Sequence, residues 1–406
     1  MSEIKWVKNS IPKTEDKYLK LMSKDNIEIS YKFHKSFPEY NATPLIRLKK
    51  MAEYLGIGEL LVKDESYRFG LNAFKVLGSS FAIGKYISKE IGKDILEVDY
   101  NFLTSQKLKD EFGQVTFFTA TDGNHGRGVA WAANKLGQKS VVRMPKGTVK
   151  ARLENIKKEN AEVSIEDLNY DDCVRLVAKE AKMSKRGVVI QDTAWEGYEE
   201  IPGWIMQGYG TMAKEAYEQM KELEINRPSH IFIQAGVGSL AGAVVGYFAN
   251  LFYDDPPIFI VMEAQAADCL YQSAIKADGE IHTVKGDLST IMAGLACGEP
   301  NTISWDILRN HVDLFVSCPD WVAAKGMRML GAPLKGDKQI ISGESGAIGM
   351  GLISTIMSDE KYLSFRKEAK LNKDSKVLIF STEGDTDPVN YRNVVWNGAY
   401  SYLSTK

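Results

Sequence analysis

The sequence predicts an α/β protein with two domains, each an open and largely parallel sheet flanked by helices. Three observations support this prediction. Short β-rich runs alternate with amphipathic helical stretches along most of the chain, which is typical of parallel βαβ units. Those runs are continuously apolar, as expected of strands buried on both faces. The chain has 406 residues, and roughly 150 residues per domain would give two or three domains.

A first series of elements occupies the second quarter of the chain. The predicted strands are 114–121, 140–145, 161–167 and 188–195, and the predicted helices are 128–137, 150–160 and 171–187.

A second series of strands follows, separated by helical sequence. It comprises 230–235, 257–263, 314–318 and 377–382. Residues 230–253 lack Asp, Glu, Lys and Arg and are long enough to span a membrane. However, Gln234 and Asn250 dilute the segment, and a glycine turn at 235–239 divides it. We therefore expect a strand, a loop and a helix there, and no contact with a membrane.

Composition and charge exclude several classes of protein. Lys and Arg number 51 against 53 Asp and Glu, which gives a net charge of −2, whereas a dedicated nucleic-acid binder usually has a basic face. Hydrophobic residues make up 44%, too many for a wholly disordered chain. The first 20 residues have no apolar core, so we expect no signal peptide and a cytoplasmic protein. The four cysteines form no CxxC pair and the five histidines no HExxH, so no metal site is expected.

A glycine-rich loop follows the strand predicted at 230–235. Glycines at the start of a helix let backbone N–H groups approach an anion, and phosphate is the natural ligand. The loop also fits the dinucleotide pattern GxGxxA through Gly236, Gly238 and Ala241, with Glu263 placed to hold a ribose. A phosphate site, a nicotinamide site and a plain tight turn all remain open at this point.

Lys75 is a candidate reactive amine. It lies between Phe74 and Val76, just after a glycine-containing loop. A lysine in apolar surroundings loses its proton readily and can form a Schiff base. Most lysines are solvated surface charges, however, and Lys63, on an expected strand, competes for the role.

Two polar loops follow predicted strands. Residues 121–128 contain three glycines at a helix start, which offer N–H donors to a carboxylate. In the same loop Asn124 offers an amide to a neutral or phenolic oxygen, and Asp122 offers a carboxylate. Residues 381–387 offer hydroxyl groups that could meet a ring nitrogen. Either loop could also be an ordinary polar turn.

Taken together, these motifs resemble the fold type II pyridoxal-phosphate (PLP) enzymes, the tryptophan synthase β family. The elements that carry the resemblance are NATPLIRL at 41–48, AFK at 73–75, TDGNHGRG at 121–128 and AGVGS at 235–239. Longer segments resemble the diaminopropionate ammonia-lyases within that family. They lie at 62–75, 120–133, 169–172, 191–198, 201–209, 291–300, 341–347 and 381–387.

The resemblance implies the cofactor PLP and a role for each matching residue. Lys75 would carry the cofactor, Asn124 would contact its phenolic oxygen, and Thr382, or its neighbour Ser381, would face the pyridine nitrogen. The phosphate would be held by Ala235, Gly236, Val237, Gly238 and Ser239. Substrate would be bound by Thr121, Asp122, Gly123, Asn124 and His125. Asp122 occupies the position at which the family usually has a serine.

The resemblance also implies an activity and a domain plan. The activity would be elimination of ammonia from D- and L-2,3-diaminopropionate, giving pyruvate. Lys75 would be the base for one stereoisomer and Asp122 the base for the other, with Asp192 as a partner for a substrate ammonium group. A large PLP-binding domain would comprise 1–85 and 196–406, with 86–195 as a smaller inserted domain and PLP in the cleft between them. A homodimer is expected, because the family is commonly dimeric.

Several alternatives remain open on the sequence alone. A serine/threonine dehydratase needs the same machinery with a hydroxyl leaving group, although Asp122 argues against it. An NAD-dependent oxidoreductase would use the glycine loop with Glu263, and a binding module could have kept the fold without the chemistry. Cys269 and Cys297 flank segments that the resemblance places near the mouth of the cleft and could pair, although reduced cysteines are expected in a cytosolic protein.

Overall fold

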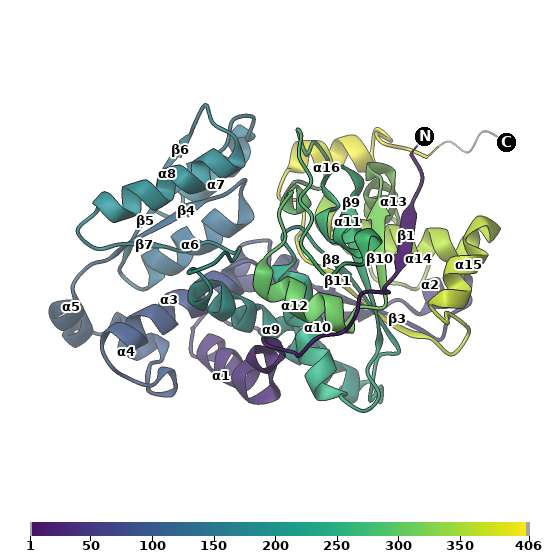
Figure 1. Cartoon of the computed structure of the whole chain (residues 1–406), viewed down its shortest axis with the longest axis horizontal. Coiled ribbons are helices and arrows are strands. Elements are labelled where there is room, and N and C mark those ends of the chain that lie inside the picture. The colour runs from purple at the N-terminus through teal and green to yellow at the C-terminus, as the bar shows by residue number, and fades with distance from the viewer. Residues whose placement is uncertain (1, 403–406) are drawn as a thin grey trace. The chain divides into compact units, whose positions relative to one another are not determined.

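The computed structural model describes residues 2–402. Packing divides the chain into two compact units. The larger unit contains Met1–Lys24, Ala42–Tyr67 and Met212–Lys406, and the smaller unit contains Asp25–Asn41 and Arg68–Thr211. Figure 1 labels the elements of both.

The smaller unit extends beyond the predicted insertion of 86–195. It also includes 25–41, 68–85 and 196–211. Helix α3 (Val76–Glu90) and helix α9 (Glu200–Glu222) explain the difference. A Cβ added to Gly78 of α3 would lie 2.6 Å from side-chain atoms of Ile205 and Tyr209, so the two helices pack closely. Lys75 therefore lies in the same unit as Asp122 and Asn124, whereas the glycine loop lies in the larger unit.

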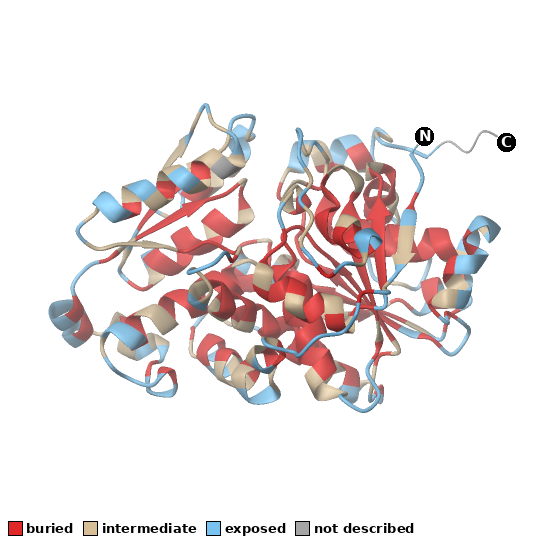
Figure 2. Cartoon of the chain, in the orientation of Figure 1, coloured by how far each residue is buried: buried red, intermediate tan, exposed pale blue. Residues whose placement is uncertain are grey.

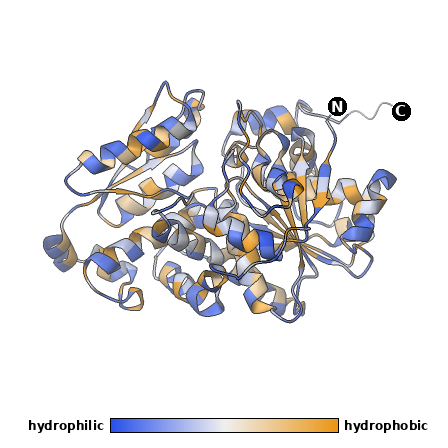
Figure 3. Ribbon diagram, viewed as in Figure 1, coloured by the Kyte–Doolittle hydropathy of each residue, from blue (hydrophilic) through white to orange (hydrophobic). Residues whose placement is uncertain are grey.

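The larger unit is built on a seven-stranded sheet of order β1-β10-β9-β8-β11-β3-β2. The five central strands are parallel, and the two edge strands run antiparallel to their neighbours. The strands are β1 (Lys5–Lys8), β2 (Leu45–Arg47), β3 (Glu59–Asp64), β8 (His230–Gln234), β9 (Ile258–Ala264), β10 (Leu314–Cys318) and β11 (Lys376–Ser381). The central strands are buried along almost their whole length, as Figure 2 shows in red. This is the burial that their apolar sequences, orange in Figure 3, predict.

Helices cover this sheet and enclose one large hydrophobic core. They are α2 (Lys49–Leu55), α10 (Ser239–Leu251), α11 (Cys269–Lys276), α12 (Thr302–His311), α13 (Asp320–Gly331), α14 (Glu344–Ser358), α15 (Leu363–Glu368) and α16 (Pro388–Val395). Local signals fix several helix starts. Asn301 accepts hydrogen bonds from the N–H groups of Ile303 and Ser304 at the start of α12, and Asp387 caps α16 with proline at its first position.

Residues 230–253, which are long and uncharged enough to span a membrane, contain strand β8 and helix α10. Both are elements of the larger unit's core. No helix within residues 2–402 is both long and apolar enough to cross a membrane.

The smaller unit has a four-stranded parallel sheet of order β6-β5-β4-β7. Its strands are β4 (Thr116–Ala120), β5 (Lys139–Met144), β6 (Glu162–Ile165) and β7 (Gly187–Val189). Besides α3 and most of α9, its helices are α1 (Lys24–Lys35), α4 (Tyr100–Thr104), α5 (Gln106–Phe112), α6 (Asn124–Lys135), α7 (Lys150–Lys157) and α8 (Tyr170–Met183). Helices cover both faces of the sheet. Val141 of β5 packs in a cluster with Val177 of α8, and its neighbour Val142 packs in another with Ala130 of α6 and Ile156 of α7.

Candidate active site

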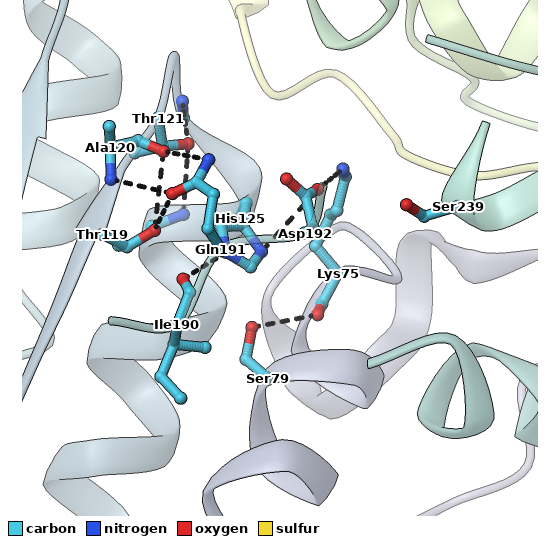
Figure 4. Close-up of polar contacts among 12 residues, drawn as sticks. Lys75, Ser79, Thr119, Ala120, Thr121, His125, Ile190, Gln191, Asp192 and Ser239 are labelled. Carbon is cyan, nitrogen blue, oxygen red and sulfur yellow. Dashed lines mark hydrogen bonds and ion pairs between the residues drawn. The ribbon is translucent and has the colours of Figure 1, made fainter. Parts of the chain in front are cut away.

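Lys75 lies in a polar cluster of the smaller unit. It immediately precedes α3, and its Nζ forms an ion pair with Oδ2 of Asp192, which follows β7 (Figure 4). The side chains are 20% and 7% exposed, respectively. The ring of Phe74 lies 5.6 Å from Nζ of Lys75 and 4.7 Å from the ring of Tyr209. Lys75 therefore combines a partly buried amine, a carboxylate partner and aromatic surroundings.

Lys63, the competing candidate, has a structural role in the larger unit. Its side chain is fully buried, and Nζ donates to the Thr43 carbonyl (2.6 Å), to Oε2 of Glu215 (2.7 Å) and to Oε1 of Gln219 (2.9 Å). An ammonium group has three protons to donate. Three acceptors account for all of them, so this geometry stabilises the charged lysine rather than a reactive amine.

This buried pair gives a stability prediction. Glu215→Ala removes a carboxylate that pairs with the buried Lys63 ammonium and should lower the free energy of unfolding by about 3–5 kcal/mol. Urea unfolding followed by circular dichroism measures this. Glu53→Ala is the control, because it removes the partner of the exposed Lys50, and it should cause no measurable change. Equal midpoints for the two variants would contradict the prediction.

His125 places a second polar atom beside Asp192. Its Nε2 donates to the Ile190 carbonyl at 2.9 Å, which fixes the tautomer, and its Nδ1 lies 3.8 Å from Oδ2 of Asp192. Nδ1 is buried and has no hydrogen-bond partner among the described residues. Burial lowers the pKa of His125 below its usual value, although the Asp192 carboxylate opposes this shift. A neutral His125 therefore presents a lone pair next to the carboxylate.

Asp192 stays ionised in this cluster. Burial opposes ionisation, but the Lys75 ammonium that pairs with the carboxylate outweighs it and lowers the pKa of the Asp192 carboxyl to about 2. Together, the carboxylate and the imidazole lone pair can accept hydrogen bonds from a primary ammonium group. In this structure the Lys75 ammonium pairs with the carboxylate.

The lowered pKa of Asp192 predicts how stability depends on pH. A carboxyl whose pKa is depressed on folding stabilises the protein above its unfolded value, and this contribution disappears as pH falls through the folded value. For a shift from 3.8 to about 2, the contribution is about 2 kcal/mol. With PLP removed, so that the Lys75 ammonium pairs with Asp192 as in this structure, wild type should exceed Asp192→Asn in urea midpoint at pH 6. The gap between the two midpoints should narrow between about pH 4 and pH 2. A gap that does not depend on pH would contradict this assignment.

Gln191, which the sequence analysis did not single out, holds Asp192 in place. Its side-chain amide exchanges two hydrogen bonds with the backbone of Ala120, at 3.1 and 3.2 Å, and donates to the Tyr170 hydroxyl at 2.6 Å. The backbone N–H of Gln191 donates to the Tyr198 hydroxyl at 2.9 Å. The matching segments at 169–172 and 191–198 were the signal available in the sequence, but only the fold shows that they meet.

The loop predicted at 121–128 is shorter than expected. Helix α6 begins at Asn124, so Gly126 and Gly128 lie inside a helix rather than in an anion-binding turn. Close packing requires both. A Cβ on Gly126 would lie 2.2 Å from Cγ2 of Thr121, and one on Gly128 would lie 2.9 Å from the backbone of Val76. The loop proper is Thr121–Gly123, and the Thr121 hydroxyl accepts the N–H groups of Gly123 (3.0 Å) and Gly126 (3.2 Å).

Asp122 lies at the edge of this loop. Oδ2 of its carboxylate accepts a hydrogen bond from Nη1 of Arg152 at 3.1 Å. The Asp122 side chain is 39% exposed. It is thus accessible, unlike Asp192.

In the larger unit, the glycine loop connects β8 to α10. Gly238, the N-cap of α10, has a φ of +98°, which favours glycine. A Cβ on Gly236 would lie 3.1 Å from Cα of Leu295. Asn301 braces the loop, because its backbone N–H donates to the Val237 carbonyl at 2.7 Å and its side chain donates to the Ser239 hydroxyl at 2.8 Å.

Ser381 is the last residue of β11 and Thr382 follows it, and their hydroxyl groups differ in their contacts. The Thr382 hydroxyl oxygen accepts a hydrogen bond from Nε2 of Gln234 at 2.9 Å, and the same Nε2 also donates to the Phe380 carbonyl. The Ser381 hydroxyl instead lies 2.8 Å from that of Ser342, within the core. Because Gln234 already donates to Thr382, the Thr382 hydroxyl proton can point to another acceptor.

Known proteins resemble this chain over nearly its whole length. Residues 37–382 match the family described as pyridoxal-phosphate dependent enzymes. This chain belongs to that family. A diaminopropionate ammonia-lyase of Salmonella typhimurium is 53% identical over 90% of this chain and 91% of its own. The crystal structure of the selenomethionine-labelled holo diaminopropionate ammonia-lyase of Escherichia coli has a TM-score of 0.90 and 45% identity, and the match covers 98% of each chain. The same E. coli enzyme in complex with an aminoacrylate-PLP azomethine reaction intermediate has a TM-score of 0.89 and 44% identity.

Membership of the PLP-dependent family confirms the predicted fold class and cofactor, and each unit has groups that suit PLP. The smaller unit offers Lys75 for the aldehyde carbon. The larger unit offers the start of α10, whose first N–H groups lack partners within the helix. Just before it, the backbone of Leu295 lies so close to Gly236 that a side chain at this position would be crowded. A phosphate suits such a helix start, and the Thr382 hydroxyl suits an unprotonated ring nitrogen.

Glu263 is not available to hold a ribose, so the dinucleotide interpretation is wrong. Its side chain is completely buried, and its two carboxylate oxygens accept the N–H groups of Leu270 (2.9 Å) and Tyr271 (2.6 Å) at the start of α11. Burial raises the pKa of Glu263 well above its usual value. The residue is a helix cap, which sequence position alone does not distinguish from a ribose ligand.

The two cysteines considered for a disulfide bond are free thiols in the structure. The Sγ of Cys269 donates to the carbonyl oxygen of Cys297 at 3.6 Å, a contact that needs the reduced thiol.

Proposed function

We propose that this protein catalyses the α,β-elimination of ammonia from D- and L-2,3-diaminopropionate. One water is consumed, and pyruvate and two ammonia molecules are released. The observation that carries the proposal is the 53% identity to the S. typhimurium ammonia-lyase over 90% of this chain, a match that also covers 91% of that relative. The site chemistry supports the same reaction.

Bound PLP supplies an electron sink, which makes the α-proton of an amino acid acidic and lets a β-substituent leave. Lys75 would hold the cofactor through its amine. The loop Ala235–Ser239 would bind the phosphate, Asn124 would contact the phenolic oxygen, and Thr382 would donate to the ring nitrogen. A hydroxyl partner leaves that nitrogen less protonated than a carboxylate would, which favours elimination.

The cluster around Asp192 suits a diamine substrate. In the working enzyme Lys75 would either hold the cofactor or act as a neutral base, so Asp192 would not keep the Lys75 ammonium as the partner it has in this structure. The carboxylate and Nδ1 of His125 can then accept hydrogen bonds from the substrate's second ammonium group. A β-hydroxyl group carries no such charge, so this arrangement favours diaminopropionate over serine.

Two proton acceptors would allow the site to use both isomers. The α-protons of the D and L forms point to opposite faces of the bound substrate. The Lys75 amine would take the proton on one face and the Asp122 carboxylate on the other. Thr121, Gly123, Asn124 and His125 would complete the substrate loop.

We further propose that the protein works in the cytoplasm as a homodimer. The free thiols of the four cysteines support a reducing compartment. Light scattering coupled to gel filtration tests the dimer: a mass near twice 45.3 kDa supports it, and a mass near 45.3 kDa contradicts it.

A direct assay tests the activity. Purified protein with PLP should release pyruvate from D- and L-diaminopropionate, with a second ammonia for each pyruvate, and should act more slowly on D- and L-serine. Absence of pyruvate from both diaminopropionate isomers would contradict the proposal. Faster turnover of serine would favour a dehydratase instead.

A further inference from the structure

Arg152 contacts Asp122 at two atoms. Its Nη1 donates to Oδ2 of the Asp122 carboxylate at 3.1 Å and to the Asp122 backbone carbonyl at 3.3 Å. A guanidinium group that contacts both side chain and backbone restricts the carboxylate's rotation and the loop's path together. Oδ1 of Asp122 makes no hydrogen bond among the described residues, so one oxygen is held and the other can accept a proton.

The loop is shaped to receive this side chain. A Cβ on Gly123 would lie 3.0 Å from Cδ of Arg152 and 3.5 Å from its Cγ. The arginine stem therefore lies directly across Gly123, and a larger residue there would displace it. The side chain of Arg152 is only 15% exposed, which distinguishes it from a solvated surface arginine.

The backbone that carries Arg152 is anchored to the sheet. Arg152 lies on α7, and Ile156, one turn later, is fully buried with Val142 and Met144 of β5. The position of the guanidinium relative to the substrate loop is therefore set by packed secondary structure within the smaller unit, rather than by the loop itself.

We propose that Arg152 is the positioning residue for Asp122. It aims the carboxylate for removal of the α-proton from the one isomer that depends on Asp122. The proton passes from the substrate α-carbon to the carboxylate, and Arg152 itself exchanges no proton. This inference rests on the proposed function, in which Asp122 and Lys75 serve opposite isomers.

The competing role for an arginine near a substrate loop is direct binding of the substrate carboxylate. Both isomers carry that carboxylate, so its loss would raise KM for both. A positioning role affects proton transfer for one isomer only. The ratio of kcat/KM for the two isomers, measured in one protein, therefore distinguishes these roles. Each isomer serves as the control for the other.

The test first identifies the isomer that Asp122→Asn loses. Arg152→Gln should then reduce kcat/KM for that same isomer by about tenfold to a hundredfold, as expected for a misplaced reacting group. The other isomer should change by less than about twofold. The primary isotope effect with α-deuterated substrate should rise for the affected isomer only, because proton removal becomes slower. Arg152→Lys keeps the charge with a different geometry and should give an intermediate loss.

Arg175→Gln is the matched control. Arg175 pairs with Asp172 in the same unit, and Asp172 is 40% exposed, similar to Asp122. This variant should leave both reactions unchanged. Retained activity on the second isomer would show that Arg152→Gln is folded. If Arg152→Gln does not fold, the ratio of kcat/KM for the two isomers in Arg152→Lys decides whether Arg152 positions Asp122.

Three results would overturn the proposal for Arg152. They are an equal loss for both isomers, a rise in KM for both, and no change for either. If wild type yields no pyruvate from either isomer, the proposed function fails before any variant is compared, and the inference falls with it.

Discussion

Lys75→Ala is expected to lose elimination of both isomers, with kcat lower by on the order of a thousandfold or more. Lys75 supplies the amine that pairs with Asp192, and alanine removes both the proposed cofactor attachment and one proton acceptor. The visible absorption band of the purified protein should also disappear. Pyruvate release and an absorption spectrum measure the two effects.

Lys89→Ala provides the control for Lys75. Lys89 lies on the same helix, α3, but is exposed and pairs with Glu200. Its replacement should leave both the spectrum and the turnover unchanged. A Lys75→Ala protein that keeps its visible band would disprove the assignment of the cofactor lysine.

Asp122→Asn is expected to separate the two isomers. Asparagine keeps the size of the side chain but cannot accept the α-proton, so one isomer should lose about 10²- to 10⁴-fold in kcat, the usual contribution of a general base. The other isomer should keep most of its rate, because the Lys75 amine serves it. Steady-state assays with each pure isomer measure the split.

Asp172→Asn is the matched control for Asp122. Both aspartates are partly exposed and pair with an arginine in the smaller unit. The control variant should not alter the ratio of the two rates. Equal loss of both isomers in Asp122→Asn would rule out the assignment of separate bases.

Strands β8, β9, β10 and β11 were predictable because each is a short, largely apolar run. Strand β10 lies at the predicted residues, β8 ends one residue early, and β9 and β11 are each shifted by one residue. The edge strands β1 and β2 were not predicted. They are three or four residues long and only partly buried, so no apolar run marks them. The start of α6 was also missed, because glycines signal a turn unless the close packing partners of Gly126 and Gly128 are known.

Part of the candidate site could be predicted and part could not. Lys75, Asp122 and Asn124 lie in local motifs that resemble the family. Arg152 and Gln191 act through residues 30 and 71 positions away in the chain, and no local pattern reports such a contact. Lys75 and Asp192 pair although they are 117 positions apart, so no local pattern predicts this contact either. Only the folded sheet brings these residues together.

Gln234 has a consequence for attempts to engineer cofactor use. This one amide ends the strand that leads into the glycine loop, and it also fixes the Thr382 hydroxyl. In the proposed cofactor site, phosphate binding by the loop and the contact of Thr382 with the ring nitrogen would both depend on the position of Gln234. A redesign of the loop for a cofactor analogue without phosphate would therefore need to keep Gln234, because its amide fixes the hydroxyl proposed to face the ring nitrogen.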